Sequence, residues 1–268
     1  MATINIATHV IAPTQGHTHT IVFLHGRGDN ATNFSRALYS WLDSQKRNLF
    51  DVYPSFKWVF PQAPPRPCAS SPSIIMPQWF DVWNTKDFSD KEEVQAAGLR
   101  EVVPTVREFI KGEAALLGGD YRRVVLAGIS MGAATSIHTL FNLDVPTGLG
   151  AFIGFSCRCP FAGRSLAEMR EVLKVGGAPG DNAFLRNTPM LLEHCADDPL
   201  VVVENGRKNR DILKSFGANV EWREYPSGGH WLHSPGGVDD IIIFLNYFLG
   251  GGGAANSAVA DGDAMDMS

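Results

Sequence analysis

The sequence predicts an α/β fold with a mostly parallel central sheet and helices on both of its faces. Two observations predict it: short β-branched or aromatic runs alternate with amphipathic segments, and the runs are apolar enough to be buried strands. Strands that alternate with helices imply right-handed crossover connections. The runs interpreted as strands are TIVFLHG from residue 20, FKWVFP, RRVVLAG, GLGAFIGFS, TPMLLEHC and ANVEWREY.

Helices are expected between these strands. NFSRALYSWLD follows the first strand, with Asn30 and Thr32 available as caps. KEEVQAAGLREVVPTVREFIKGEAALL has helical apolar spacing, and Pro104 is expected to kink it. Further helices are predicted in MGAATSIHTLFNL, ENGRKNRDILKSFG and VDDIIIFLNYFL. A proline- and serine-rich loop is expected over residues 61–90, and a mixed excursion over residues 156–187 follows the fourth strand.

One α/β domain is expected over residues 20–250, between an N-terminal segment (1–19) and a C-terminal tail (251–268). The tail is glycine-rich and poor in large apolar residues, so it is predicted to be disordered. The N-terminus lacks the basic and apolar regions of a signal peptide, and no stretch approaches the roughly 18 apolar residues of a membrane helix. A cytoplasmic protein without stable membrane insertion is therefore expected.

Composition narrows the function classes. A net charge of −5 and a pI near 5.9 argue against a protein that binds nucleic acid or anionic membranes by general electrostatics. The four cysteines are too few for a disulfide scaffold and lack the paired spacing of a zinc site. We expect free thiols, no metal and no cofactor.

The candidate nucleophile is Ser130, within Gly128-Ile129-Ser130-Met131-Gly132. A serine presented at a sharp strand-to-helix turn needs small residues two positions away on both sides, because larger side chains would collide there. The turn also places the serine at a helix N-terminus, where free N–H groups favour developing negative charge. The alternative is a purely structural glycine-rich turn.

A serine hydroxyl needs a base, and in the α/β-hydrolase chain order an acid and then a histidine follow the nucleophile. His230 is preferred as the base because it follows a flexible YPSGG loop at the carboxyl end of a strand. His233 is the second choice, whereas His138 and His194 are expected to be core or supporting residues.

For the acid, Asp197 and Asp198 follow a buried strand, and spacing alone does not separate them. Asp144 is a third candidate, in the loop after the nucleophile helix.

An oxyanion hole requires two N–H donors. One is expected from Met131, directly after the serine, and the other from Arg27, because the loop His25-Gly26-Arg27-Gly28 follows an earlier strand. Glycines in that loop allow the backbone to approach a ligand closely. His25 and Asp29 are expected to hold the loop by local hydrogen bonds.

These motifs together resemble the acyl-protein thioesterase, lysophospholipase and carboxylesterase family of α/β-hydrolases. The matching segments, in family order from about residue 20 to residue 248, are VFLHGRGDN, FPQAPPRP, MPQWFDVW, LAGISMGAATSIHTL, HCADDPLVVVENG and YPSGGHWLH.

The resemblance implies a triad of Ser130, Asp198 and His230, since Asp198 stands directly before Pro-Leu-Val. It implies Arg27 and Met131 as the oxyanion donors, and Trp79 and Phe80, in a loop beside the active site, as substrate-binding residues. The expected substrates are small-molecule or acylated-protein esters and thioesters, and a homodimer is possible because dimers occur among relatives.

Two departures bear on the substrate. Relatives commonly have glutamine after the serine and a further glycine two residues later, where this chain has Met131 and Ala133. The segment that helps to form the acyl channel in relatives is FSCRCPFAG here, so Arg158 argues against a long-chain lipid substrate. The competing classes are a non-catalytic binding protein that keeps the hydrolase fold and a peptidase on the same fold.

Overall fold

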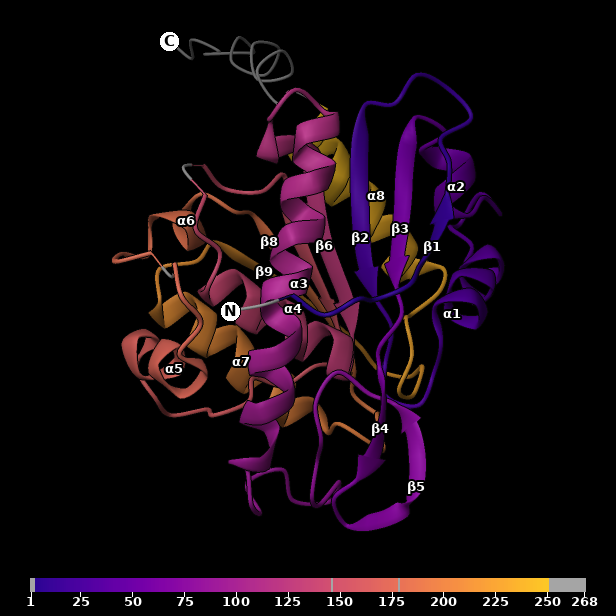
Figure 1. Ribbon diagram of the computed structural model, residues 1–268. Helices are drawn as coiled ribbons and strands as arrows, with labels where there is room; N and C mark the ends of the chain where they lie inside the picture. The colour runs from indigo at the N-terminus through magenta and orange to yellow at the C-terminus, as the bar shows by residue number, and fades with distance from the viewer. Residues whose placement is uncertain (1–2, 146, 178, 251–268) are drawn as a thin grey trace, which may run out of the picture.

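The structure is a computed structural model, and it describes residues 3–145, 147–177 and 179–250. Within these residues the central sheet has seven strands, in the order β1-β3-β2-β6-β7-β8-β9 (Figure 1). Every neighbouring pair is parallel except β1 with β3, at one edge. The strands are β1 (Thr8–Ile11), β2 (His19–Leu24), β3 (Phe56–Pro61), β6 (Val124–Ile129), β7 (Ala151–Phe155), β8 (Met190–Cys195) and β9 (Val220–Tyr225). The predicted α/β class with a mostly parallel sheet is confirmed.

The central strands are buried over their whole length because helices cover both faces. Every residue of β6, β7 and β8 is buried. Alternate residues serve opposite faces, as the two-residue period of a strand requires: Val124 and Leu126 join one apolar cluster, whereas Val125 and Ala127 join the other. These two clusters are the core of the protein.

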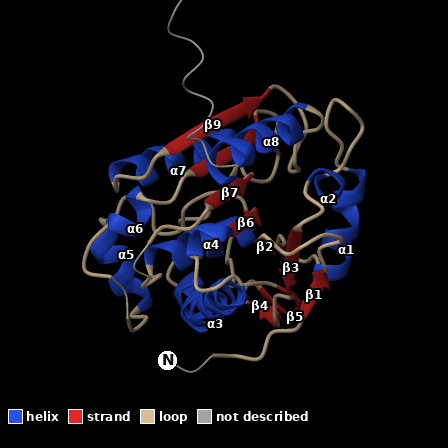
Figure 2. Ribbon diagram, turned by 90° about the horizontal axis from the view of Figure 1, so that it is seen from above, coloured by secondary structure: helices blue, strands red, loops and turns tan. Residues whose placement is uncertain are grey.

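Figure 2 shows how the helices divide between the two faces of the sheet. The larger apolar cluster lies under α3 (Val94–Leu116), α4 (Met131–Phe141), α5 (Leu166–Leu173), α6 (Ala183–Arg186) and α7 (Val203–Ser215). The second cluster lies under α1 (Ala31–Ala37), α2 (Leu49–Val52) and α8 (Gly236–Leu249). Short 3₁₀ turns occupy Leu38–Ser40 and Tyr121–Arg123. No helix in the described part of the chain is long and apolar enough to cross a membrane.

Two segments differ from the sequence-based expectation. The segment over residues 1–19 contributes β1 to the sheet, so the folded unit begins before residue 20. The expected loop over residues 61–90 contains an antiparallel hairpin of β4 (Pro65–Cys68) and β5 (Ser71–Pro77), which lies beyond the ends of β2 and β3 (Figure 1). Helix α3 runs through Pro104, the position of the expected kink, and ends at Leu116. The excursion over residues 156–187 contains two short helices, α5 and α6. The predicted C-terminal tail lies outside the described residues.

Candidate active site

Ser130 stands at the turn between β6 and α4, where it is the residue that caps the helix. Its backbone angles are φ 55° and ψ −121°, which a side-chain-bearing residue adopts only under strain. Its N–H donates to the Phe155 carbonyl of β7 at 2.9 Å, and its own carbonyl accepts the Ala134 N–H of α4 at 3.0 Å. The strained turn is therefore held from the strand side and from the helix side.

The glycines around this serine are required by close backbone packing. A Cβ on Gly128 would lie 2.5 Å from the Ala133 nitrogen, and one on Gly132 would collide with the carbonyl oxygens of Leu24 and His25. The glycines are therefore required for the steric reason that the sequence predicts. The collision at Gly132 is with the end of β2 and the loop after it.

Asp198 and His230 form a hydrogen-bonded pair at the carboxyl edge of the sheet. Nδ1 of His230 lies 2.7 Å from Oδ2 of Asp198, whose side chain is fully buried. The other oxygen of Asp198 accepts the N–H groups of Leu200 and Val201, both at 2.9 Å. Burial alone would raise the pKa of this carboxyl, but hydrogen bonds from His194, His230 and Val201 outweigh it and hold the pKa well below its usual range. Asp198 is therefore an anion, and it accepts a hydrogen bond from the protonated Nδ1 of His230.

Asp197 has a different task from its neighbour. Its carboxylate accepts the N–H groups of Gly228 and Gly229, at 3.2 and 2.8 Å, and so fixes the loop that carries His230. The structure thus brings Asp198, and not Asp197, to the imidazole. Asp144 lies elsewhere, beside Gly177 and Arg107.

The three other candidate histidines are placed away from the serine. Nε2 of His194 donates to the Val201 carbonyl at 2.7 Å and lies 3.3 Å from Oδ2 of Asp198, so it supports the carboxylate from behind. His233 stacks on Tyr225 with ring centroids 4.0 Å apart. His138 is completely buried, which lowers its pKa to about 4 and keeps it neutral.

The loop after β2 runs alongside the serine. A Cβ on Gly26 would lie 3.6 Å from Cβ of Ser130. His25 fixes the loop from within: its Nδ1 donates to the Gly26 carbonyl at 2.7 Å, and its Nε2 accepts the Ala63 N–H at 3.1 Å. Burial lowers the pKa of His25, in keeping with this neutral, structural role. Trp79 completes the support by donating from its indole to the His25 carbonyl at 2.8 Å.

The two expected oxyanion donors face the same space. Met131 is the first residue of α4, so its N–H has no acceptor within the helix. In the part of the chain that the structure describes, the Arg27 N–H has no protein acceptor either. The side chain of Arg27 points to the hairpin, where it donates to Gln78 at 2.8 Å and to Sγ of Cys68 at 3.3 Å. Gln78 could not be identified from the sequence, because it is fully buried and lies 51 positions from Arg27 in the chain.

Candidate catalytic and oxyanion residues surround a cavity of about 1080 Å³. Ser130, His230, Arg27 and Met131 all line it, and so does Phe80. Trp79 does not: its side chain is fully buried behind the loop, which corrects the expectation that it contacts the substrate directly. Much of the remaining wall is apolar, from Met76, Val82, Phe88, Ile129, Ala134, Cys159, Ala162, Pro199, Leu200, Val201, Val202, Ile212 and Trp231.

Two of the four cysteines contact this arrangement, since Cys68 accepts a hydrogen bond from Arg27 and Cys159 lies in the apolar wall of the cavity. All four cysteines are buried free thiols. Burial raises the pKa of the Cys157 thiol to about 12, so it is unreactive at neutral pH. Among the described residues no group of three or more histidine, cysteine, aspartate or glutamate side chains could hold a metal ion.

The fold and the arrangement around this cavity define an α/β-hydrolase. Residues 5–249 match the Phospholipase/Carboxylesterase family, and the chain belongs to that family. It is therefore a hydrolase.

Two sets of relatives extend this placement. The chain is 29% identical over 247 residues to acyl-protein thioesterase 1 of Gibberella zeae. This alignment covers 91% of this chain and 97% of the relative. It is 28% identical over 192 residues to acyl-protein thioesterase 1 of Schizosaccharomyces pombe, covering 72% of this chain and 74% of the relative. Among solved structures, acyl-protein thioesterase 2 of Zea mays aligns with a TM-score of 0.67 at 27% identity, over 91% of this chain and 99% of the maize chain.

Proposed function

We propose that this protein is a serine hydrolase that cleaves carboxylic ester or thioester bonds through an acyl-enzyme. The observation that carries the proposal is the hydrogen bond between Asp198 and His230, because His230 lines the same cavity as the strained Ser130. The Phospholipase/Carboxylesterase family supports ester substrates, and the acyl-protein thioesterase relatives support thioesters of acylated proteins. Small-molecule esters are proposed beside them.

In the proposed acylation step, Oγ of Ser130 attacks the carbonyl carbon while Nε2 of His230 takes the hydroxyl proton. The C=O electron pair moves to the oxygen, and the N–H groups of Arg27 and Met131 stabilise that charge. When the tetrahedral species collapses, the bond to the leaving alcohol or thiol breaks and His230 returns the proton to it. Water then attacks the acyl-serine in the same way and releases the acid.

Asp198 supports this cycle electrostatically. Because its pKa is held low, it stays ionised and favours the His230 tautomer with the proton on Nδ1. That tautomer leaves Nε2 free to act as the base. The carboxylate also stabilises the imidazolium that forms during attack.

The test is hydrolysis of p-nitrophenyl butanoate, p-nitrophenyl octanoate and octanoyl thioester by wild-type protein and by Ser130→Ala. We expect wild-type turnover of esters and thioesters, and a fall in kcat of roughly 10³-fold or more in the variant. A circular dichroism spectrum that matches wild type establishes that the variant is folded. Undiminished turnover by folded Ser130→Ala would contradict the proposal.

A further inference from the structure

Arg158 is a buried cation in the wall of the cavity. It lies in the segment after β7, is only 8% exposed and lines the cavity together with Ser130. Its guanidinium carbon lies 4.1 Å from the centre of the Phe88 ring, and one nitrogen donates to Oε1 of Gln95 at 2.6 Å. The side chain is thus held in place by a ring and a neutral amide.

The charge of this guanidinium is incompletely compensated by the protein. Its nearest acid is Glu92, whose Oε1 lies 4.0 Å away and already accepts the Phe161 N–H at 2.7 Å. Among the described residues, no carboxylate lies within hydrogen-bond distance of Arg158. Burial lowers the pKa of Arg158 to about 10, so it remains a cation at neutral pH. A guanidinium has five N–H donors, and a buried cation without a close anion is costly, so the site is suited to an anionic ligand.

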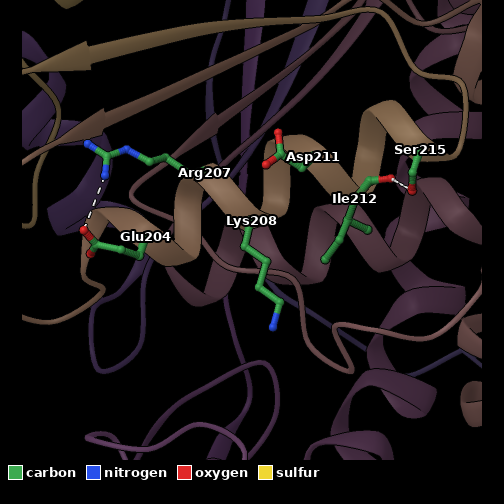
Figure 3. A pocket seen from close by; sticks show the side chains of 6 residues that line it. All are labelled: Glu204, Arg207, Lys208, Asp211, Ile212 and Ser215. Atoms are coloured by element: carbon green, nitrogen blue, oxygen red, sulfur yellow. Dashed lines mark hydrogen bonds and ion pairs between the residues drawn. The ribbon is translucent and has the colours of Figure 1, made fainter.

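A second cation lines the same cavity from α7. Figure 3, which draws a separate pocket on this helix, shows Lys208 and Ile212 on one side of α7, pointing away from Arg207 and Asp211. Both Lys208 and Ile212 line the cavity. The ion pairs of α7 use other residues, since Arg207 pairs with Glu224 and Asp211 with Arg210. In the described part of the chain Lys208 has no ion pair.

The acids that line the cavity are occupied by local hydrogen bonds. Asp29 accepts the Asn30 N–H at 2.8 Å, and Asp87 accepts the N–H and hydroxyl of Ser89 at 3.0 and 2.6 Å. Glu92 is engaged by the backbone N–H of Phe161. The remaining charged lining groups are the cations of Arg27, Lys86, Arg158 and Lys208. Four lining cations thus face three lining carboxylates, so the charged groups of the cavity carry an excess of one positive charge, and among the described residues neither Arg158 nor Lys208 has a carboxylate within hydrogen-bond distance.

We propose that Arg158 and Lys208 bind a carboxylate on the far end of the substrate's acyl chain. The substrate class is then a monoester or monothioester of a dicarboxylic acid. A planar guanidinium matches a carboxylate with two parallel hydrogen bonds, and the apolar side chains of Ala134, Cys159 and Ile212 suit the methylene groups between the two ends. This inference rests on the proposed function and names the substrate of that same site.

The test compares two substrates of equal length: the p-nitrophenyl monoester of octanedioic acid and the same ester with its free carboxyl methylated. We expect wild type to prefer the anionic substrate by about tenfold or more in kcat/KM, mainly through KM, because a charge-assisted hydrogen bond is worth roughly that factor. Arg158→Gln should remove the preference, because it should lower kcat/KM much more for the anionic substrate than for the methylated one. Lys208→Gln should reduce the preference by a few-fold.

The matched control is Lys214→Gln, which removes an exposed lysine from the same helix outside the cavity. We expect it to keep the preference. A second measurement does not depend on Arg158→Gln folding: octanedioate should inhibit hydrolysis of the methylated substrate by wild type at lower concentration than octanoate does, and less well in Lys208→Gln.

Several results would overturn the inference. Equal kcat/KM for the two substrates would do so, as would an equal loss on both in Arg158→Gln, which would indicate a structural role only. A third ester, 3-carboxy-4-nitrophenyl octanoate, places the anion on the leaving group; an Arg158-dependent preference for it alone would contradict binding on the acyl side. Failure of the proposed function is distinguishable, since Ser130→Ala would then hydrolyse the methylated ester as wild type does.

Discussion

Strands β6 and β7 are neighbours; both end in a glycine and an apolar residue, and a serine follows each strand directly. Gly128 pairs with Gly154 in the sheet, and Ile129 pairs with Phe155. Both serines have positive φ, 55° at Ser130 and 45° at Ser156. In both, the N–H bonds to the next strand, at 2.9 Å for the first and 3.0 Å for the second. The two strand ends are thus nearly the same up to the serine.

The two strand ends differ in the residues directly after the serine. After Ser130 helix α4 begins at once, and Gly132 allows it to pack on the loop after β2. After Ser156 the chain continues without a helix until α5, and Arg158 stands where the first strand end has Gly132. Ser156 is fully buried, and its hydroxyl lies 3.5 Å from the Trp231 carbonyl. Strain alone therefore does not distinguish the two serines: the helix N-terminus and access to the cavity are what set Ser130 apart, and they support its proposed role as nucleophile.

Covalent labelling tests directly whether the two serines differ in reactivity. A fluorophosphonate probe reacts with an activated serine hydroxyl, so Ser130→Ala should abolish labelling while Ser156→Ala is labelled as wild type is. The measurement is in-gel fluorescence of purified, folded proteins. Labelling that survives in Ser130→Ala but is lost in Ser156→Ala would reverse the assignment, and a wild type that is never labelled would favour a binding protein on the hydrolase fold.

The adjacent aspartates after β8 extend the comparison to the acid. Asp198→Asn should lower kcat by about 10³–10⁴-fold, because a neutral amide no longer fixes the His230 tautomer. Asp197→Asn should cost about tenfold or less, since it only loosens the loop held through Gly228 and Gly229. Steady-state kinetics on one ester measures both. Equal losses in the two variants would mean that the distinction between the aspartates is wrong.

Gly132 is a further difference between the two strand ends, because the second has Arg158 at the equivalent position. Gly132→Ala places a Cβ against the Leu24 and His25 carbonyls, which belong to backbone and cannot easily yield. Overpacking of this kind costs about 1–3 kcal/mol, and at roughly 2–4 °C per kcal/mol the melting temperature should fall by several degrees. Gly112→Ala is the control, because that helical glycine has nothing within 4 Å and alanine there should be neutral or stabilising. If both variants melt alike, the close approach at Gly132 does not constrain the turn.

The sequence predicted those features whose cause is local. The apolar runs of β6, β7 and β8 identify the buried strands, and the glycines beside Ser130 identify a strand-to-helix turn. The expected chain order of serine, acid and histidine predicts His230 as the base and one of the two adjacent aspartates as the acid.

Other features could not be predicted because their cause is a contact across the fold. The hairpin of β4 and β5 has mostly exposed side chains and four prolines, so it has no strand-like alternation to detect. Adjacent aspartates differ only in where their carboxylates reach. Gln78 gains its role from Arg27, and Trp79 supports the loop after β2 from 54 positions away. Such long-range hydrogen bonds leave no periodic pattern in the sequence.

The smallest expected effect concerns Glu193, whose backbone carbonyl accepts the Ser156 N–H. Its side chain is buried, and among the described residues both carboxyl oxygens have no hydrogen-bond partner. Burial, and next the charge of Asp240, raise the pKa of this carboxyl well above its usual range. In the window between the ordinary carboxyl pKa and the raised one, the folded protein binds a proton that the unfolded chain has lost, so stability falls as pH rises through this window.

Glu193→Gln removes that ionisation while it keeps the size of the side chain. We therefore expect the variant to be more stable than wild type at pH 8, by about 1 kcal/mol or a few degrees in melting temperature, and to show little gain at pH 5. Asp198 acts in the opposite direction, because its lowered pKa makes its contribution disappear only as pH falls well below 4. Thermal melts of both proteins from pH 5 to pH 8 measure the difference. A wild type whose stability rises steadily over that range, with no gain in the variant at pH 8, would show that Glu193 is ionised in the folded protein and that its buried site tolerates a charge.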